Sequence, residues 1–291
     1  MVKIVFIGAS GYRNIGDNAY KELFTDNLPQ AYQCYFESPY PDLDILKNAD
    51  LMVIGGGGLI YDNESEHFNY MKMYIDEAIR LNIPYGFSSA GIQWRTDNPL
   101  EELKRWTEYL KGAKFICLRS PKGKEIISEL TGRNDVKYYP DLCYLLKPSD
   151  YYINSEFDIL FIPHEVATRE DNDFTRAFKK AIADGKKVMI AQFSRDEEKA
   201  VDYFREIATP HNNLVCRKDL TPREALGLVS QAKEVHTFRY HGLVFANSLN
   251  VPVKTYFRTT KILSEIKPHP LEKSNAVYHA DKIMEALNGK N

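Results

Sequence analysis

The chain opens with MVKIVFIGASGYRNIGDN, residues 1–18, and this stretch decides its fold class. Val2–Ile7 is an apolar run with the length of a buried strand, and a polar segment with glycines follows it. A helical pattern then covers residues 17–28. A buried strand that passes through glycines into a helix is typical of α/β proteins with parallel sheets.

The same alternation of strand and helix continues along the chain. Further strands are predicted at residues 51–54, 84–88, 114–118, 136–139, 158–162, 187–191, 213–216, 234–238 and 251–256. Helices are predicted between them at residues 64–81, 99–111, 121–130, 171–183, 197–208, 222–231 and 242–249. Strands that alternate with helices of this length predict βαβ units, and hence parallel sheets with helices on both faces.

The length of the chain and one polar segment predict two domains. At roughly 150 residues per domain, a chain of 291 residues accommodates two. The stretch KPSDYYINSE, residues 147–156, is polar, contains a proline and is the best linker candidate. We therefore expect α/β domains at residues 1–147 and 148–291, the second with a closing helix at about residues 278–287.

The composition excludes several classes of protein. The chain has 38 Lys+Arg and 40 Asp+Glu, so its net charge of -2 argues against a nucleic-acid or polyanion partner. No apolar run approaches the ~18 residues needed to span a bilayer. The four cysteines are widely spaced without a CxxC pair, as in a cytosolic protein with free thiols. The histidines lack partners at metal-ligand spacing, and we predict no metal site.

The first candidate for a ligand-binding segment is the glycine-containing stretch at residues 8–18. In open α/β sheets, ligands bind beyond the carboxyl ends of the strands, and this stretch follows the first strand. Its glycines allow close approach of a ligand to the backbone, and the helix N-terminus attracts an anion. The spacing is not GxGxxG, which argues against dinucleotide binding. For Asp17, capping of the helix is the favoured alternative to ligand binding.

A run of four glycines is the second candidate, and it directly follows the strand predicted at residues 51–54. A plain turn needs one or two glycines, so four predict a loop that passes against a bound ligand. The run lacks the GK[ST] ending of a Walker loop. Asp62, which follows closely, could bind a hydroxyl group, act as a base or cap a helix.

The third candidate is a run of small residues at 88–93, which follows the strand predicted at 84–88. Cations follow other predicted strands. Arg119, after the strand at 114–118, could clamp a carboxylate or phosphate, although a surface ion pair is the alternative. Arg239 and His241 meet at a strand end before an apolar helix, whose N-terminus would bind an anion and depress the histidine pKa. Lys261 also lies on the carboxyl side.

Together these segments resemble the polysaccharide pyruvyl transferase family. The matching residues, in chain order, are G-Y-x-N-I-G-D-N (Gly11, Tyr12 and residues 14–18), G-G-G-G-L-I-x-D (residues 55–62), S-x-G-I (residues 89–92), Arg119, Pro140-Asp141, R-Y-H-G-L-V-F-A (residues 239–246) and Lys261. Two positions depart from the usual pattern of the family. Ser120 stands where Asp often follows the Arg, and Tyr240 stands in place of Leu.

The resemblance implies a glycosyltransferase-B-like fold, in which two Rossmann-like domains face each other across a cleft. It implies phosphoenolpyruvate as co-substrate, without a cofactor, and an acceptor that is a sugar or a lipid-linked glycan. The product would be a pyruvate ketal in a cell-envelope glycan. The implied protein is cytoplasmic, with peripheral association where glycan precursors are assembled, and it is compatible with an oligomer.

The resemblance also assigns roles to residues. The residues that it implies for donor binding are Arg119, Arg239, His241, Lys261, Gly55, Gly56, Gly57 and Gly58. Acceptor binding, on the side of the N-terminal domain, falls to Tyr12, Asn14, Asp17 and Asp62. His241 would be the acid or the phosphate clamp, and Asp62 or Asp17 the base. A small anionic donor needs a few placed cations rather than a positive net charge.

Two other functions stay open at this point. A nucleotide-sugar glycosyltransferase would use the same fold, with Glu265 or Glu272 as the ribose ligand. A non-catalytic glycan-binding protein would not require the glycines, Arg, His and Lys at strand ends. The sequence also has 19 tyrosines, and Tyr12, Tyr61 and Tyr240 lie in the candidate segments, where a ring could stack on a sugar.

Overall fold

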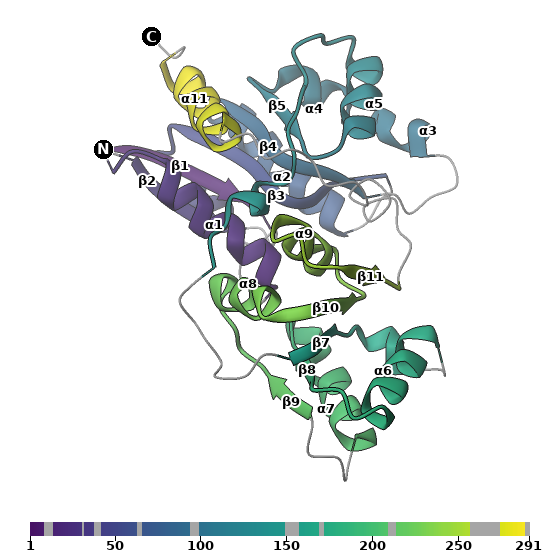
Figure 1. The fold of residues 1–291 in the computed structure, drawn as a ribbon. Coiled ribbons are helices and arrows are strands. Elements are labelled where there is room, and N and C mark those ends of the chain that lie inside the picture. The colour runs from purple at the N-terminus through teal and green to yellow at the C-terminus, as the bar shows by residue number, and fades with distance from the viewer. Residues whose placement is uncertain are drawn as a thin grey trace. The chain divides into compact units, whose positions relative to one another are not determined.

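The computed structural model describes residues 1–8, 14–30, 32–37, 42–62, 66–93, 99–148, 157–168, 172–208, 214–256 and 274–288 (Figure 1). The chain divides into two compact units. The first comprises Met1–Gly11, Tyr20–Leu145 and Pro270–Asn291, and the second comprises Tyr12–Ala19 and Leu146–His269. These units differ from the division expected at residue 147, because residues 12–19 group with the second unit and residues 270–291 with the first.

The first unit contains a six-stranded parallel sheet with the strand order β2-β1-β3-β4-β5-β6. Its strands are β1 (Val2–Ile7), β2 (Tyr32–Glu37), β3 (Leu51–Tyr61), β4 (Tyr85–Gln93), β5 (Ile116–Leu118) and β6 (Lys137–Tyr138). Its helices are α2 (Glu66–Arg80), α3 (Pro99–Leu103), α4 (Thr107–Gly112), α5 (Pro121–Thr131) and α11 (Ser274–Asn288). Helix α1 (Ile15–Asn27) belongs to the second unit up to Ala19 and to the first unit from Tyr20.

The second unit contains a five-stranded parallel sheet with the order β11-β10-β7-β8-β9. Its strands are β7 (Phe157–Ile162), β8 (Val188–Ala191), β9 (Leu214–Arg217), β10 (Ala232–Thr237) and β11 (Val253–Thr255). Its helices are α6 (Asp173–Ala183), α7 (Glu198–Ile207), α8 (Pro222–Ser230) and α9 (Tyr240–Ser248). Two parallel sheets with intervening helices confirm the predicted α/β class.

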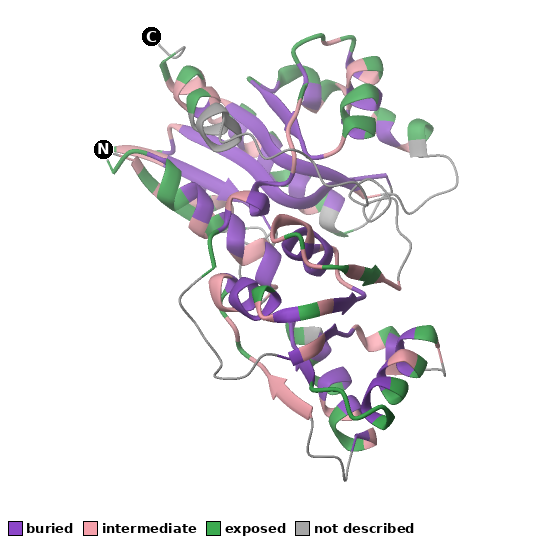
Figure 2. Cartoon of the chain, viewed as in Figure 1, coloured by how far each residue is buried: buried purple, intermediate pink, exposed green. Residues whose placement is uncertain are grey.

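Each unit has its own hydrophobic core, shown as buried ribbon in Figure 2. In the first core the indole of Trp106 is fully buried, donates a hydrogen bond from Nε1 to the Tyr61 carbonyl oxygen at 2.7 Å and meets Phe68 edge-on. In the second core Phe161 meets the rings of Phe174 and Phe178 edge-on. Edge-to-face pairs of buried rings stabilise a core beyond the area that they remove from water.

Helix boundaries follow from capping residues. The hydroxyl of Ser120 accepts a hydrogen bond from the Gly123 amide at 3.0 Å, and this bond caps α5. Thr221 and Glu224 form a reciprocal capping box at α8, with Pro222 in the first helical position. Ser120, which departs from the family pattern, therefore has a local structural role.

The four-glycine run lies within a strand, so the expectation of a loop was wrong. Strand β3 continues through the glycines to Tyr61, and all of its residues are buried. A Cβ on Gly55 would overlap the Ser88 carbonyl oxygen of β4, and one on Gly56 would lie 2.7 Å from the Tyr20 ring. Gly56 also has a φ of +74°, a conformation that favours glycine. Close packing of backbone and ring explains these two glycines without a ligand.

The small residues at 88–93, which were expected to follow the strand at 84–88, belong to the strand itself. Strand β4 runs to Gln93, and its register against β3 and β5 shifts within this stretch. Ser89 has a φ of +51° and is buried, which is costly for a residue with a side chain. A strained, buried residue at the carboxyl end of a parallel sheet points to a functional site nearby.

Candidate functional site

A buried ion pair lies at the carboxyl end of the first sheet. Arg119 directly follows β5, Asp141 follows β6, and Arg119 Nη1 lies 3.0 Å from Asp141 Oδ2. Their side chains are 5% and 0% exposed. The sequence left a ligand clamp or a surface ion pair open for Arg119, and the structure shows a buried pair instead.

Tyr20 of α1 completes a buried triad with these two residues. Its hydroxyl donates to Asp141 Oδ2 at 2.5 Å and accepts from Arg119 Nη1 at 3.0 Å. Burial, and secondarily the Asp141 charge, raises the pKa of Tyr20 well above its usual value. Tyr20 therefore stays a protonated donor at neutral pH and fixes the carboxylate that holds the guanidinium.

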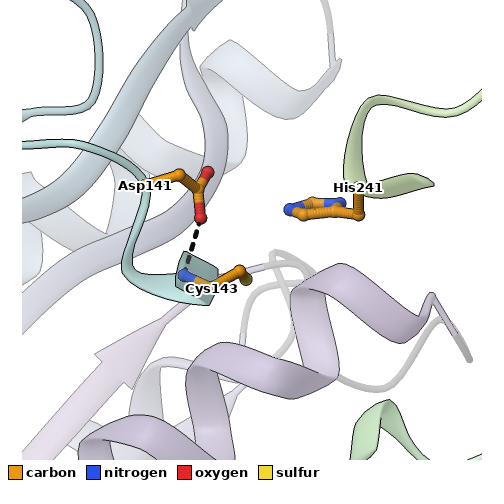
Figure 3. A group of neighbouring side chains, drawn as sticks. All are labelled: Asp141, Cys143 and His241. Atoms are coloured by element: carbon orange, nitrogen blue, oxygen red, sulfur yellow. Dashed lines mark hydrogen bonds between the residues drawn. The ribbon is translucent and has the colours of Figure 1, made fainter. Parts of the chain in front are cut away.

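Backbone groups and a glycine shape the rest of this cluster. The other carboxylate oxygen, Asp141 Oδ1, accepts a hydrogen bond from the Cys143 amide at 2.9 Å (Figure 3). A Cβ on Gly91 would lie 2.6 Å from Arg119 Nε, so the glycine of the S-x-G-I segment makes room for the guanidinium. The arrangement fixes a buried guanidinium beside a carboxylate at the end of the sheet.

The candidate acceptor residues occupy different environments. Asp62 directly follows β3 and is fully buried, and its backbone amide donates to the Gln93 carbonyl at 3.3 Å. Asp17 lies partly exposed in the first turn of α1. The cap of α1 is Asn14, whose Oδ1 accepts from the Gly16 amide at 3.0 Å, so the capping role favoured for Asp17 belongs to Asn14. Tyr61 is buried in β3.

His241 lies in the first turn of α9 in the second unit, and its side chain is also drawn in Figure 3. The imidazole is buried, and a Cβ on Gly16 of α1 would overlap it. The ring of Tyr240 meets it edge-on, with 5.0 Å between the ring centroids. The histidine is thus held at a helix N-terminus, the position that the sequence predicted.

Arg239 is the N-cap residue of α9 and forms an ion pair with Glu197. Glu197 is fully buried, and its Oε2 accepts hydrogen bonds from the backbone amides of Phe193 and Ser194 at 2.6 and 3.1 Å. Glu197 was not predicted as a site residue from the sequence. The S-x-x-E spacing from Ser194 to Glu197, a capping box in the structure, was the signal available for it.

A pocket of about 270 Å³ opens at the carboxyl ends of β8 and β9 in the second unit. Its lining residues are Ile15, Asn18, Gln192, Arg195, Glu198, Asp219 and Leu220. Ile15 and Asn18 belong to the candidate segment at residues 8–18, whereas the other five lining residues were not predicted from the sequence. Four predicted candidates, Tyr12, Lys261, Glu265 and Glu272, lie outside the described residues.

Within the described residues, no helix combines the length and the apolar character that crossing a membrane requires. A search of the curated proteins found no match.

Solved structures with a similar fold include a UDP complex, a UDP-GlcNAc 2-epimerase and a UDP-glucosyltransferase. The structure of S. aureus MnaA with UDP has a TM-score of 0.65 at 13% identity, covering 99% of this chain and 89% of that one. UDP-GlcNAc 2-epimerase from Neisseria meningitidis, bound to UDP-GlcNAc, has a TM-score of 0.58 at 10% identity, with 98% and 90% covered. A UDP-glucosyltransferase from Polygonum tinctorium has a TM-score of 0.53 at 12% identity, with 99% and 91% covered.

At these identities the likeness shows the fold alone, and it confirms the glycosyltransferase-B-like class with two Rossmann-like domains. A family model covers nearly the whole chain: the polysaccharide pyruvyl transferase model matches residues 7–253. That match spans the buried triad, the pocket and the first turn of α9, and it shows that the chain belongs to the polysaccharide pyruvyl transferase family.

Proposed function

We propose that this protein transfers the pyruvyl group of phosphoenolpyruvate to two hydroxyl groups of a sugar in a glycan or glycan precursor, with a pyruvate ketal and phosphate as products. The family match over residues 7–253 is the observation that carries this proposal. The reaction needs no metal or redox cofactor, because its steps are proton transfers, hydroxyl additions and loss of phosphate.

The reaction consists of two successive additions of a sugar hydroxyl to the same carbon of phosphoenolpyruvate. An acid donates a proton to the methylene carbon of phosphoenolpyruvate, and one sugar hydroxyl adds to the cationic carbon while it loses its proton to a base. Phosphate then leaves, and the second hydroxyl adds to the same carbon and loses its proton. The two hydroxyl groups lose two protons in all. One balances the proton that the acid gives to the new methyl group, and the other leaves with phosphate.

Four cationic residues provide the donor-side groups of this proposal. We assign the carboxylate or phosphate of phosphoenolpyruvate to Arg119, whose guanidinium is already oriented by Asp141 and Tyr20. His241, at the N-terminus of α9, is the acid or the phosphate ligand. Arg239 and Lys261 complete the cationic donor set.

On the acceptor side, Asp17 suits the role of the base better than Asp62. Asp17 is partly exposed in the first turn of α1, whereas Asp62 has no exposed surface. A base must come within hydrogen-bond distance of the hydroxyl proton that it removes.

A phosphate-release assay with phosphoenolpyruvate and a panel of sugars and lipid-linked sugars tests the function. We expect release with at least one acceptor, and a loss of roughly 100-fold or more in kcat for His241→Ala, in the range of a lost general acid. His164→Ala, at a histidine of the same unit outside the proposed set, is the matched control. Turnover of a UDP-sugar without any phosphate release from phosphoenolpyruvate would instead establish the nucleotide-sugar glycosyltransferase.

A further inference from the structure

The pocket at the ends of β8 and β9 has no role in the donor chemistry, and its walls come from three segments of the second unit. Gln192 and Arg195 follow β8, and Asp219 follows β9. The first turn of α1 forms the third wall and is held there by a hydrogen bond from the Ile15 amide to the Phe193 carbonyl at 2.8 Å. Carboxyl ends of parallel strands are where open α/β sheets bind ligands.

Gln192 is the polar group that points to a ligand. Its side chain lines the pocket although the residue is only 9% exposed. Its Nε2 has a single long hydrogen bond, to the Arg195 carbonyl at 3.4 Å, and its amide oxygen accepts none from another described residue. The amide oxygen of this nearly buried residue still reaches the pocket, where a ligand hydroxyl can donate to it in place of water.

Two further polar side chains of the lining have unused hydrogen-bonding capacity. The amide of Asn18 and the guanidinium of Arg195 make no side-chain hydrogen bond to any described part of the chain. Asp219 has a φ of +54°, a strained conformation that is often kept where it positions a group for function. The pocket thus presents donors and acceptors at several points of one small volume.

The charges favour a neutral ligand over an anionic one. The lining includes the carboxylates of Glu198 and Asp219 and the guanidinium of Arg195, and Lys218 Nζ lies 3.7 Å from Glu198 Oε1, so the positive and negative charges balance. A nucleoside diphosphate would bring further negative charge beside these carboxylates, which costs free energy. Hydroxyl groups, by contrast, donate to carboxylates and to the Gln192 oxygen and accept from Arg195 and Asn18.

The size and the apolar groups fit a single ring. The volume of about 270 Å³ is just below the range of ~300–1,000 Å³ for drug-sized ligands. Ile15 and Leu220 offer apolar surface for the C–H face of a sugar. We propose that this pocket is a sugar subsite that holds a ring of the glycan acceptor, an inference that rests on the proposed function.

Steady-state kinetics on the full chain test the subsite. For Gln192→Ala and for Arg195→Ala, we expect the KM of the acceptor to rise about 10-fold, as for a lost hydrogen bond to substrate. The KM of phosphoenolpyruvate should stay within about 2-fold, because the donor-side residues are unchanged. Arg195 is exposed, so its variant keeps the test valid if Gln192→Ala fails to fold. Gln231→Ala, at a glutamine of the same unit outside the lining, should match the unaltered protein.

Saturation-transfer NMR with methyl glycosides and with uridine diphosphate separates this proposal from the proposed function, because it needs no turnover. Sugar signals that weaken in Gln192→Ala and Arg195→Ala, but not in Gln231→Ala, support the subsite even if phosphate release fails. Equal sugar signals in all variants would overturn the sugar subsite. A Gln192→Ala variant that weakens the uridine diphosphate signal but not the sugar signals would also overturn it. An unchanged acceptor KM in both variants would also overturn it.

Discussion

Gly16 lies against the imidazole of His241 so closely that any side chain on Gly16 would overlap the ring. The glycine of the N-I-G-D segment therefore has a packing partner in the R-Y-H-G segment, 225 residues later in the sequence. This contact and the hydrogen bond from the Ile15 amide to the Phe193 carbonyl both join the first turn of α1 to the rest of the second unit.

Gly16→Ala should destabilise the second unit by about 1–3 kcal/mol, the usual cost of overpacking a tight site. In the background of His241→Ala, where the ring is gone, the same change should cost much less. A double-mutant cycle in urea measures this coupling. Additive effects of the two changes would mean that the ring and the glycine do not constrain each other.

Asp141→Ala should destabilise the first unit by roughly 3–5 kcal/mol, because it leaves the buried Arg119 guanidinium without its carboxylate. Asp135→Ala is the matched control, since the side chain of Asp135 in its pair with Arg133 is 53% exposed. Breaking that pair should cost no more than about 1 kcal/mol. Denaturant unfolding of both variants checks the contrast, and similar losses for the two would refute a special role for burial.

Tyr20→Phe should alter the stability at alkaline pH. Because the pKa of Tyr20 is raised in the folded state, its contribution to stability is fully present below the unfolded pKa of about 10 and is lost as the pH rises beyond it. The stability difference between the unaltered protein and Tyr20→Phe should therefore narrow above about pH 10. Urea unfolding across a pH series measures it, and a constant difference would contradict the raised pKa.

His236 should titrate below its ordinary value. Burial lowers the pKa of His236 from 6.5, against the opposing effect of Glu234, whose Oε1 lies 3.0 Å from Nε2. A depressed histidine pKa gives stability that is present above the unfolded pKa and is lost as the pH falls through the folded pKa. NMR titration of the imidazole should give a midpoint below 6.5, and His236→Phe should lose less stability on acidification. A midpoint above 6.5 would show that Glu234 outweighs burial.

Local sequence signals predicted much of the fold, because most strands and helices carry their own pattern. Pro222 after Thr221 marks the start of α8 in sequence and in structure. Strand β2 was missed, since YQCYFE mixes polar and apolar residues in an edge strand that is only partly buried. Its pairing with β1, from Val2 opposite Tyr32, is a tertiary contact that no local pattern encodes.

The candidate site, too, could be predicted only where a local sequence pattern marks its residues. Arg119 and His241 could be named because a cation after a strand is visible in one sequence. Tyr20 could not, because its hydroxyl meets Asp141 across 121 positions of the chain. The glycine run was misinterpreted for a related reason: the ring that packs on Gly56 and the strand that packs on Gly55 come from distant segments.

Helix α11 packs on β3, and its Ile283 is fully buried in the first unit. During synthesis, the ribosome adds the five strands of the second sheet before it adds α11. The second unit can therefore complete its own core while the first still exposes the surface that α11 covers. A nascent chain arrested before residue 274 would present that apolar surface to chaperones. In the finished chain, α11 would cover the surface and end this exposure.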